Sequence, residues 1–206
     1  MALRTLFATP ILEANLADRS DFPTFNAELA GACLMLADED QAGRAWSRAN
    51  GYRGYTSYAS LNDLPTRASI FGKLKTRLDK LARGFADDLH LELGTGRLVL
   101  DNMWVNVMKA GATHSGHIHP HSVISGTVYV ATPPGASGLK LEDPRLAMMM
   151  AAPPRRADAP DLARTFVYLT PEPGTVFMWE SWLRHEVPPN TTKNPRISLS
   201  FNYAWR

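Results

Sequence analysis

The sequence has one cysteine, no marked excess of either charge and no long hydrophobic run. A single cysteine, Cys33, excludes an internal disulfide framework and any cysteine-based zinc site. Because it lies in the apolar run from Ala32 to Leu36, we expect it to pack inside a helix. No segment approaches the roughly 20 apolar residues of a membrane-spanning helix, and the first residues lack the apolar stretch of a signal peptide. These absences predict a soluble, cytoplasmic protein.

The charges are nearly balanced, with 22 lysines and arginines against 20 aspartates and glutamates and a net charge of +2. The basic residues are dispersed along the chain, which argues against a nucleic-acid partner or an anionic membrane surface. A chain of 206 residues is long enough for one domain with its own core. We therefore expect a single domain that acts on a small molecule or a peptide, and domains of this kind often form homodimers.

The first half of the chain has the pattern of helices. One helix is predicted from Asp21 to about Ala37, because Pro23 stands near the first helical position. A second is predicted for about residues 66–90, where apolar side chains recur every three or four positions. Residues 43–62 are rich in glycine, serine, asparagine and tyrosine and have no helical period. We expect a loop or irregular strands there.

From Gly94 onward, short runs of β-branched and aromatic residues alternate with glycine, proline and asparagine. Strands this short predict an antiparallel sandwich or barrel with the helices on one side, in the α+β or mainly β class. The proline-rich residues 148–160 are expected to form a long loop. We divide the domain (1–206) into a helical support region (1–97) and a strand core (98–206). The predicted strands cover residues 98–100, 103–108, 122–131, 166–169, 175–179 and 196–203.

Four of the six histidines lie within eight residues, at positions 114, 117, 119 and 121. In a strand, residues i and i+2 point to one face, so His117 and His119 can both turn toward one metal ion. Neutral imidazole is a good ligand for Fe(II), Zn(II), Ni(II) or Cu(II). The candidate for the third ligand is His185, close to the predicted end of another strand. We expect a metal held by His117, His119 and His185.

Other interpretations of this cluster stay open. An alternative register would use His119 and His121 as ligands, although Pro120 between them would disturb a strand. The cluster could also capture metal adventitiously on the surface of a β-sandwich that has a binding or structural role and no catalytic activity. His114 and His121 are expected to be neighbours of the site, not ligands.

The last predicted strand has polar residues from Arg196 to Asn202 on one face and apolar residues on the other. Either this is an edge strand with its polar face in water, or the polar face lines the metal pocket, since the strand begins eleven residues after His185. Arginine pairs bidentately with carboxylates, and a hydroxyl two residues later can add a hydrogen bond. A dicarboxylate cosubstrate would fit, with one end on the metal and the other on Arg196 and Ser198.

Several short motifs follow one another in the second half of the chain. They are His117-x-His119, Ser125-Gly126-x-Val128-Tyr129, Trp179, His185-Glu186-Val187-Pro188, and Arg196-x-Ser198 ending in Phe201-Asn202. This pattern resembles the 2-oxoglutarate/Fe(II)-dependent oxygenase superfamily, most closely a bacterial and phage group of unassigned substrate. The resemblance covers residues 100–206. It implies a double-stranded β-helix (a jelly-roll, cupin-like fold), Fe(II), 2-oxoglutarate as cosubstrate and a hydroxylase-type reaction.

Carried over by position, the resemblance implies that His117 and His185 ligate iron and that Arg196 binds the distal carboxylate of 2-oxoglutarate. It assigns no catalytic residue beyond the metal centre. Most of the superfamily has a carboxylate where this chain has His119, and a third imidazole leaves the centre one charge more positive. This departure keeps open a cupin-like three-histidine metalloenzyme that does not use 2-oxoglutarate. The other residues expected to bind or face the cosubstrate are Ser198, Tyr129, Asn106 and Asn202.

Overall fold

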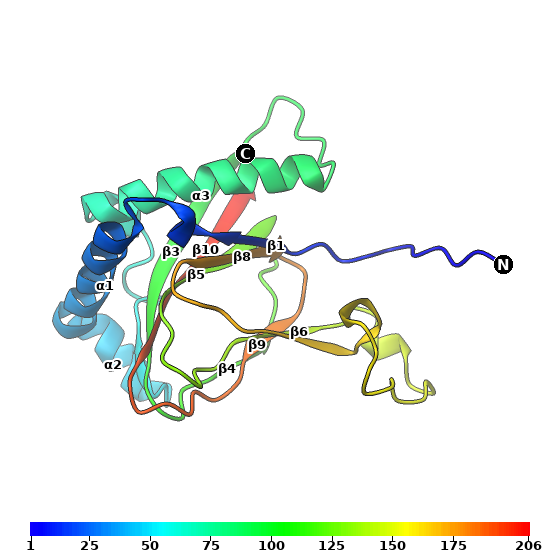
Figure 1. Ribbon diagram of the computed structural model, residues 1–206. Coiled ribbons are helices and arrows are strands. Elements are labelled where there is room, and N and C mark those ends of the chain that lie inside the picture. Colours follow the sequence, from blue (N-terminus) through cyan, green and yellow to red (C-terminus); the bar gives the residue numbers. More distant parts are fainter.

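The structure, a computed structural model that describes residues 1–206, consists of two antiparallel sheets that face each other (Figure 1). The strands are β1 (Leu12–Asn15), β2 (Gly54–Thr56), β3 (Leu98–Met108), β4 (His114–His117), β5 (Ile124–Ala131), β6 (Leu139–Glu142), β7 (Phe166–Leu169), β8 (Thr175–Glu180), β9 (His185–Val187) and β10 (Arg196–Trp205). The larger sheet has the order β1-β8-β5-β10-β3-β2 and the smaller one β4-β9-β6-β7. This arrangement is the double-stranded β-helix expected from the sequence.

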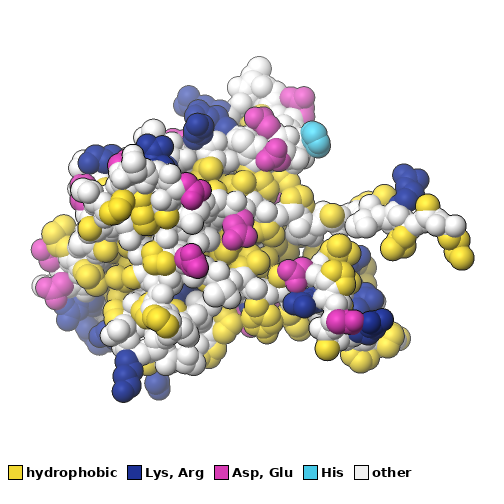
Figure 2. Space-filling view, in the orientation of Figure 1, with side chains coloured by type: hydrophobic (Ala, Val, Ile, Leu, Met, Phe, Trp, Pro, Cys, Tyr) yellow, Lys and Arg dark blue, Asp and Glu magenta, His cyan; other side chains and the backbone are white.

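Three α-helices pack against the larger sheet: α1 (Phe22–Glu39), α2 (Gln41–Ala49) and α3 (Ser69–Asp88). Helices α1 and α3 confirm the two predicted helices, and they cover the outer face of the sheet (Figure 1). None of the helices combines the length and the apolar character that a membrane crossing requires. Figure 2 shows side chains of both charges scattered over this side of the molecule, as the balanced composition leads one to expect.

Helix α2 was not predicted, so the expectation of a loop or irregular strands for residues 43–62 is wrong over its first part. The helix begins after Asp40, whose side chain accepts a hydrogen bond from the Gly43 N–H at 3.0 Å. Its buried positions are a glycine and a serine, Gly43 and Ser47, so no apolar period marks it. A side-chain cap and a small-residue contact thus replace the hydrophobic stripe on which the prediction relied.

The strands differ from the prediction mainly where they are short. Residues 98–108 form one continuous strand, β3, where two were expected. Strands β1, β6 and β9 have only three or four residues, too few for a visible alternation, and were not predicted. The strand expected at the histidine cluster is β4, which is equally short. Strands β1 and β2 lie at the two edges of the larger sheet, so residues 1–97 contribute strands as well as helices. The long loop predicted for residues 148–160 is confirmed, between β6 and β7 (Figure 1).

Alternation along the strands separates two environments. In β10, Ile197, Leu199 and Phe201 belong to the main core between the larger sheet and the helices. Arg196 and Ser198, which are also buried, point to the opposite face, between the two sheets. The polar face of this strand therefore does not lie in water, and the edge-strand interpretation is wrong. Strand β10 is central, paired with β3 on one side and β5 on the other.

Gly126 in β5 lets this sheet pack closely. A Cβ atom there would meet the ring of Phe201 and, at 2.6 Å, the carbonyl oxygen of Phe177. We expect Gly126→Ala to lower the free energy of unfolding by about 1–3 kcal/mol, because backbone atoms would have to move. Gly31→Ala is the matched control, since nothing lies within 4 Å of its added Cβ. Urea unfolding measures both variants, and equal stability of the two would contradict the prediction.

Candidate metal centre and adjoining cavity

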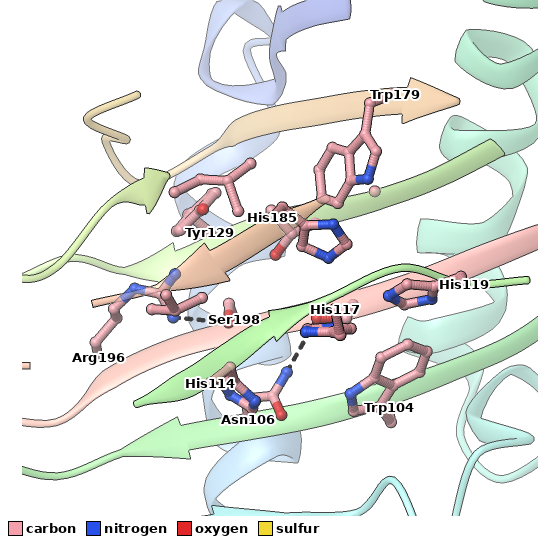
Figure 3. A pocket seen from close by; sticks show the side chains of 15 residues that line it. Trp104, Asn106, His114, His117, His119, Tyr129, Trp179, His185, Arg196 and Ser198 are labelled. Atoms are coloured by element: carbon pink, nitrogen blue, oxygen red, sulfur yellow. Dashed lines mark hydrogen bonds between the residues drawn. The ribbon is translucent and has the colours of Figure 1, made fainter. Parts of the chain in front are cut away.

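Three histidines meet between the two sheets (Figure 3). His117, His119 and His185 each offer a ring nitrogen, and these nitrogens lie within 4.8 Å of one another. His117 ends β4 and pairs in register with His185, which begins β9. The two rings have centroids 4.4 Å apart. Antiparallel pairing of two very short strands thus brings together residues that are 68 positions apart in the sequence.

His119 lies near the same point, but strand pairing does not position it. The expectation that it shares a strand with His117 is wrong, because β4 ends at His117. A backbone hydrogen bond of 2.9 Å from the His119 N–H to the Ser181 carbonyl holds the segment after the strand. Its ring centroid lies 5.2 Å from that of His185 and 6.1 Å from the Trp104 ring, which stacks on it. The tertiary contacts with Ser181 and Trp104 therefore position His119.

Hydrogen bonds fix how two of these rings face the site. His117 Nδ1 bonds the Ser115 carbonyl at 2.7 Å, and His185 Nδ1 bonds the Leu183 carbonyl at 2.9 Å. Carbonyl oxygens only accept, so both Nδ1 atoms donate and both Nε2 atoms keep a free lone pair. His119 Nε2 is buried without any partner. Two unprotonated Nε2 atoms and the unpartnered Nε2 of His119 are a donor set that fits a divalent transition metal.

Burial keeps His119 and His185 neutral, the form that binds metal. Burial lowers the pKa of His185 to about 3 and that of His119 to about 4, and nearby His117 contributes in the same direction. Burial likewise lowers the pKa of His114 to about 4. At neutral pH these three imidazoles therefore carry no positive charge that would repel a cation.

Acidification of the metal-free protein is expected to destabilise it. In the unfolded chain His185 takes up a proton near pH 6.5, whereas in the folded chain it does so only near pH 3. Stability present above pH 6.5 is therefore lost progressively between pH 6.5 and 3, by about 2 kcal/mol at pH 5 for this one group. Urea unfolding at pH 7 and pH 5, with a chelator present, measures the difference. A free energy of unfolding that does not fall at pH 5 would contradict it.

Arg196 lies beside this centre and has no acidic partner. It is 2% exposed, and its NH1 group contacts Met108 Sδ at 3.1 Å and Ser198 Oγ at 3.2 Å. Its Cζ lies 4.7 Å from the centroid of the Tyr129 ring. Burial raises the pKa of Tyr129, so the phenol stays protonated and can donate a hydrogen bond. A buried guanidinium without a carboxylate is costly, so this place is suited to a bound anion.

Unpartnered polar atoms concentrate around this cavity. Six buried side-chain nitrogen or oxygen atoms in the protein have no hydrogen-bond partner, and four of them belong to residues that line it. Buried polar groups are nearly always paired in folded proteins, so these four indicate a missing ligand and not a packing defect. The four atoms are His119 Nε2, Tyr129 Oη, Trp179 Nε1 and Arg196 Nε.

The site has an inner and an outer space. The inner cavity, between the histidines and Arg196, has a volume of about 50 Å³, room for about four water molecules. The outer cleft has a volume of about 720 Å³ and reaches the surface. His114, His117, His119 and Trp104 line both spaces, so they form the boundary between them. A slender ligand fits the inner cavity and a larger one the outer cleft.

The remaining residues predicted for the site fall on both sides of this boundary. Asn106 lines the inner cavity, accepts a hydrogen bond from Thr56 Oγ1 and donates one to Ser200 Oγ. Asn202 lines the outer cleft instead, where it accepts a hydrogen bond from Ser125 Oγ. His114 bonds the Tyr52 hydroxyl at 3.0 Å, as a neighbour of the centre. His114 lies outside the group of three histidines whose ring nitrogens meet.

Sequence reasoning missed several residues that line the two spaces. Trp104 could have been found, because it lies two positions before Asn106 on β3 and so shares its face. Trp179 appears among the motif residues without a role, and its buried side chain also lines the inner cavity. Tyr52 and Trp46 reach the outer cleft from the N-terminal part of the chain, where no periodic pattern pointed to them.

Comparisons with known proteins find one matching sequence family and several structures that share the fold. Residues 102–202 match the sequence family described as "Putative 2OG-Fe(II) oxygenase", a span that contains every residue of the inner cavity. No curated protein sequence matches the chain.

Solved structures of low sequence identity share the fold. A Pseudomonas putida prolyl-4-hydroxylase has a TM-score of 0.61 at 16% identity, over 95% of this chain and 93% of that one. EctD from S. alaskensis, solved with 2-oxoglutarate and 5-hydroxyectoine, gives 0.64 at 17%, over 96% and 72%. HygX from Streptomyces hygroscopicus, solved with iron bound, gives 0.58 at 13%, over 96% and 83%. The double-stranded β-helix is thereby established for this chain.

Proposed function

Because this chain belongs to the 2-oxoglutarate/Fe(II)-dependent oxygenase superfamily, we propose that His117, His119 and His185 hold Fe(II) and that 2-oxoglutarate lies between them and Arg196. The protein is an enzyme of this superfamily, an oxygenase of hydroxylase type whose substrate is unknown. Bound together, Fe(II) and 2-oxoglutarate supply the oxidation: O2 and 2-oxoglutarate give succinate and CO2, and one oxygen atom goes to a substrate C–H bond.

The observation that carries this proposal is the set of unpartnered atoms around the inner cavity. A metal at the three histidines satisfies His119 Nε2. A carboxylate at the other end satisfies Arg196 Nε and the Tyr129 hydroxyl, with Ser198 beside them. A slender dicarboxylate that reaches from the histidines to Arg196 does both at once. The buried arginine thus argues against a three-histidine enzyme that ignores 2-oxoglutarate, and against a site that captures metal by accident.

Within this proposal the chain's own residues bind, orient and exclude water. The backbone carbonyls of Ser115 and Leu183 hold two imidazoles in the tautomer that leaves Nε2 free. Asn106, fixed by Thr56, forms part of the cavity wall. Three neutral ligands leave the metal its full charge of +2. With the positive charge of Arg196 the site carries +3, which the two negative charges of 2-oxoglutarate reduce to +1.

The substrate, a small molecule or a peptide, binds in the outer cleft next to the metal. No lysine or arginine lines this cleft, and its one carboxylate, Asp101, pairs with Arg206 at 2.5 Å. Aromatic rings line it instead, among them Trp46, Tyr58 and Trp104. Such walls favour recognition by aromatic contact and hydrogen bonds over ion pairs. We place the enzyme in the cytoplasm, which is consistent with its one cysteine being a free, buried thiol.

The test is anaerobic reconstitution of the metal-free protein with Fe(II), followed by titration with 2-oxoglutarate and then by exposure to O2. The expected results are one Fe(II) per chain, saturable 2-oxoglutarate binding that requires the metal, and slow release of succinate and CO2 without added substrate. Metal binding with no effect of 2-oxoglutarate would favour the cupin-like alternative. A protein that is purified without metal, and whose stability metal does not change, would favour a non-catalytic role.

A further inference from the structure

The proposed ligands satisfy three of the four unpartnered atoms around the inner cavity and leave the fourth, the indole nitrogen of Trp179. Trp179 is 3% exposed and lines the inner cavity. An indole N–H is a donor only, and leaving it buried and unpaired costs about 1–3 kcal/mol. Phenylalanine or leucine at an apolar position carries no such cost, because neither side chain has a polar atom. The polar atom of Trp179 therefore calls for an acceptor that the chain itself does not provide.

The position of Trp179 places this acceptor at the metal end of the cavity. The side chain comes from β8, and its ring meets that of His185 edge-on, with centroids 4.7 Å apart. In Figure 3 its nitrogen lies on the side of the ring that faces His185 and His119, whereas Arg196 and Tyr129 lie together elsewhere in the pocket. The anion that satisfies Arg196 at one end of the cavity therefore presents its other end near Trp179.

No neighbouring protein atom substitutes for that acceptor. His185 Nδ1 already bonds the Leu183 carbonyl, and its Nε2 lone pair is the one available to a metal. The face of the His185 ring can accept only a weak N–H···π contact, which is second-order beside an N–H···O bond. An anionic oxygen delivered by the ligand is the acceptor of the right chemistry, because charge-assisted hydrogen bonds are the stronger ones.

We propose that the Trp179 indole N–H donates a hydrogen bond to the metal-side carboxylate of 2-oxoglutarate. This inference rests on the proposed function. Trp179 is then a binding residue that holds the end of the cosubstrate opposite to the one held by Arg196, and that fixes its orientation at the metal. Two anchors at opposite ends favour a ligand with two carboxylates over one that has a single carboxylate.

Two substitutions at Trp179 separate the N–H group from the ring. Trp179→Phe keeps an aromatic side chain, and 3-benzothienylalanine at position 179 keeps the shape of the indole while replacing the N–H with sulfur. For the Mn(II)-loaded protein, calorimetric titration with 2-oxoglutarate is expected to give an affinity about 10- to 100-fold lower in both. Mn(II) affinity in the absence of 2-oxoglutarate should change by less than about threefold.

The control is Trp205→Phe, because the Trp205 indole bonds the Leu93 carbonyl at 3.1 Å and lines neither space. It should bind 2-oxoglutarate like the wild type. Wild-type affinity in the benzothienylalanine protein would overturn the role of the N–H group. An equal loss of Mn(II) and 2-oxoglutarate affinity would show that Trp179 acts only through the histidines, and it would also overturn the proposal. If the wild type itself did not bind 2-oxoglutarate, the proposed function would fail instead.

Discussion

Replacement of Arg196 by methionine is expected to remove most 2-oxoglutarate binding while leaving the protein folded. The guanidinium is 2% exposed, has no acidic partner and leaves Nε unpaired. Truncation of one partner of a buried, hydrogen-bonded charge pair costs about 2–5 kcal/mol, so we expect the affinity to fall by about 30-fold to several thousand-fold. Calorimetric titration of the Mn(II)-loaded variant with 2-oxoglutarate measures the loss.

The same substitution is expected to leave the apo protein at least as stable as the wild type, although it lowers 2-oxoglutarate affinity. Without the cosubstrate, Arg196 is a buried charge that no carboxylate compensates, and methionine of similar length fills the space without that cost. The free energy of unfolding of the apo protein should therefore stay unchanged or rise, by up to about 4 kcal/mol. A lower free energy of unfolding in the variant would indicate that Arg196 has a structural role instead.

The control for Arg196 is Arg156→Met, since Arg156 is exposed in the loop between β6 and β7 and pairs only with Asp158. It should bind 2-oxoglutarate normally. If Arg196→Met bound 2-oxoglutarate within threefold of the wild type, Arg196 would not be the residue that binds the carboxylate, whatever the stability of the variant. Arg196→Lys is expected to recover only part of the affinity, because an ammonium group lacks the planar fork.

Much of this site could be predicted because side chains in a strand alternate with a period of two. The face shared by Arg196 and Ser198 follows from position alone once residues 196–203 are taken as a strand. The sequence could not show that this strand is central, since the pairing of β10 with β3 and β5 involves segments 60 or more residues away. The sequence alone therefore allows the edge-strand interpretation, and the order of strands in the sheet excludes it.

Other parts of the site depend on contacts that leave no local pattern. His119 lies beyond the end of β4, and its place depends on a hydrogen bond to Ser181 that is 62 residues distant. The bond between Tyr52 and His114 joins the helical region to the strand core over a similar span. Helix α2 carries Trp46 into the outer cleft, and its capping aspartate gives no periodic signal. Periodicity predicts which face of a strand or helix a residue occupies, but it does not predict which segments of the chain come into contact.

His119→Ala is expected to lower metal affinity by more than about a hundredfold. Mutation of groups that merely orient a metal ligand costs about 10- to 100-fold, so loss of a ligand costs more. Competition with a chelator, under anaerobic conditions with Fe(II), measures the dissociation constant. His121→Ala is the control, because His121 lines only the outer cleft and is outside the group of three nitrogens that meet within 4.8 Å. Loss of metal affinity in His121→Ala, with none in His119→Ala, would contradict the assignment of His119 and would indicate His121 as a ligand.

His119→Asp separates the need for a third ligand from the need for an imidazole. A carboxylate is a suitable ligand for Fe(II), so the aspartate variant should recover most of the affinity that alanine loses. It also lowers the charge of the centre by one, which weakens the attraction between the metal and the two negative charges of 2-oxoglutarate. We therefore expect His119→Asp to bind Fe(II) well and 2-oxoglutarate less tightly than the wild type. Equal or tighter 2-oxoglutarate binding would mean that the third imidazole of this centre serves some purpose other than its charge.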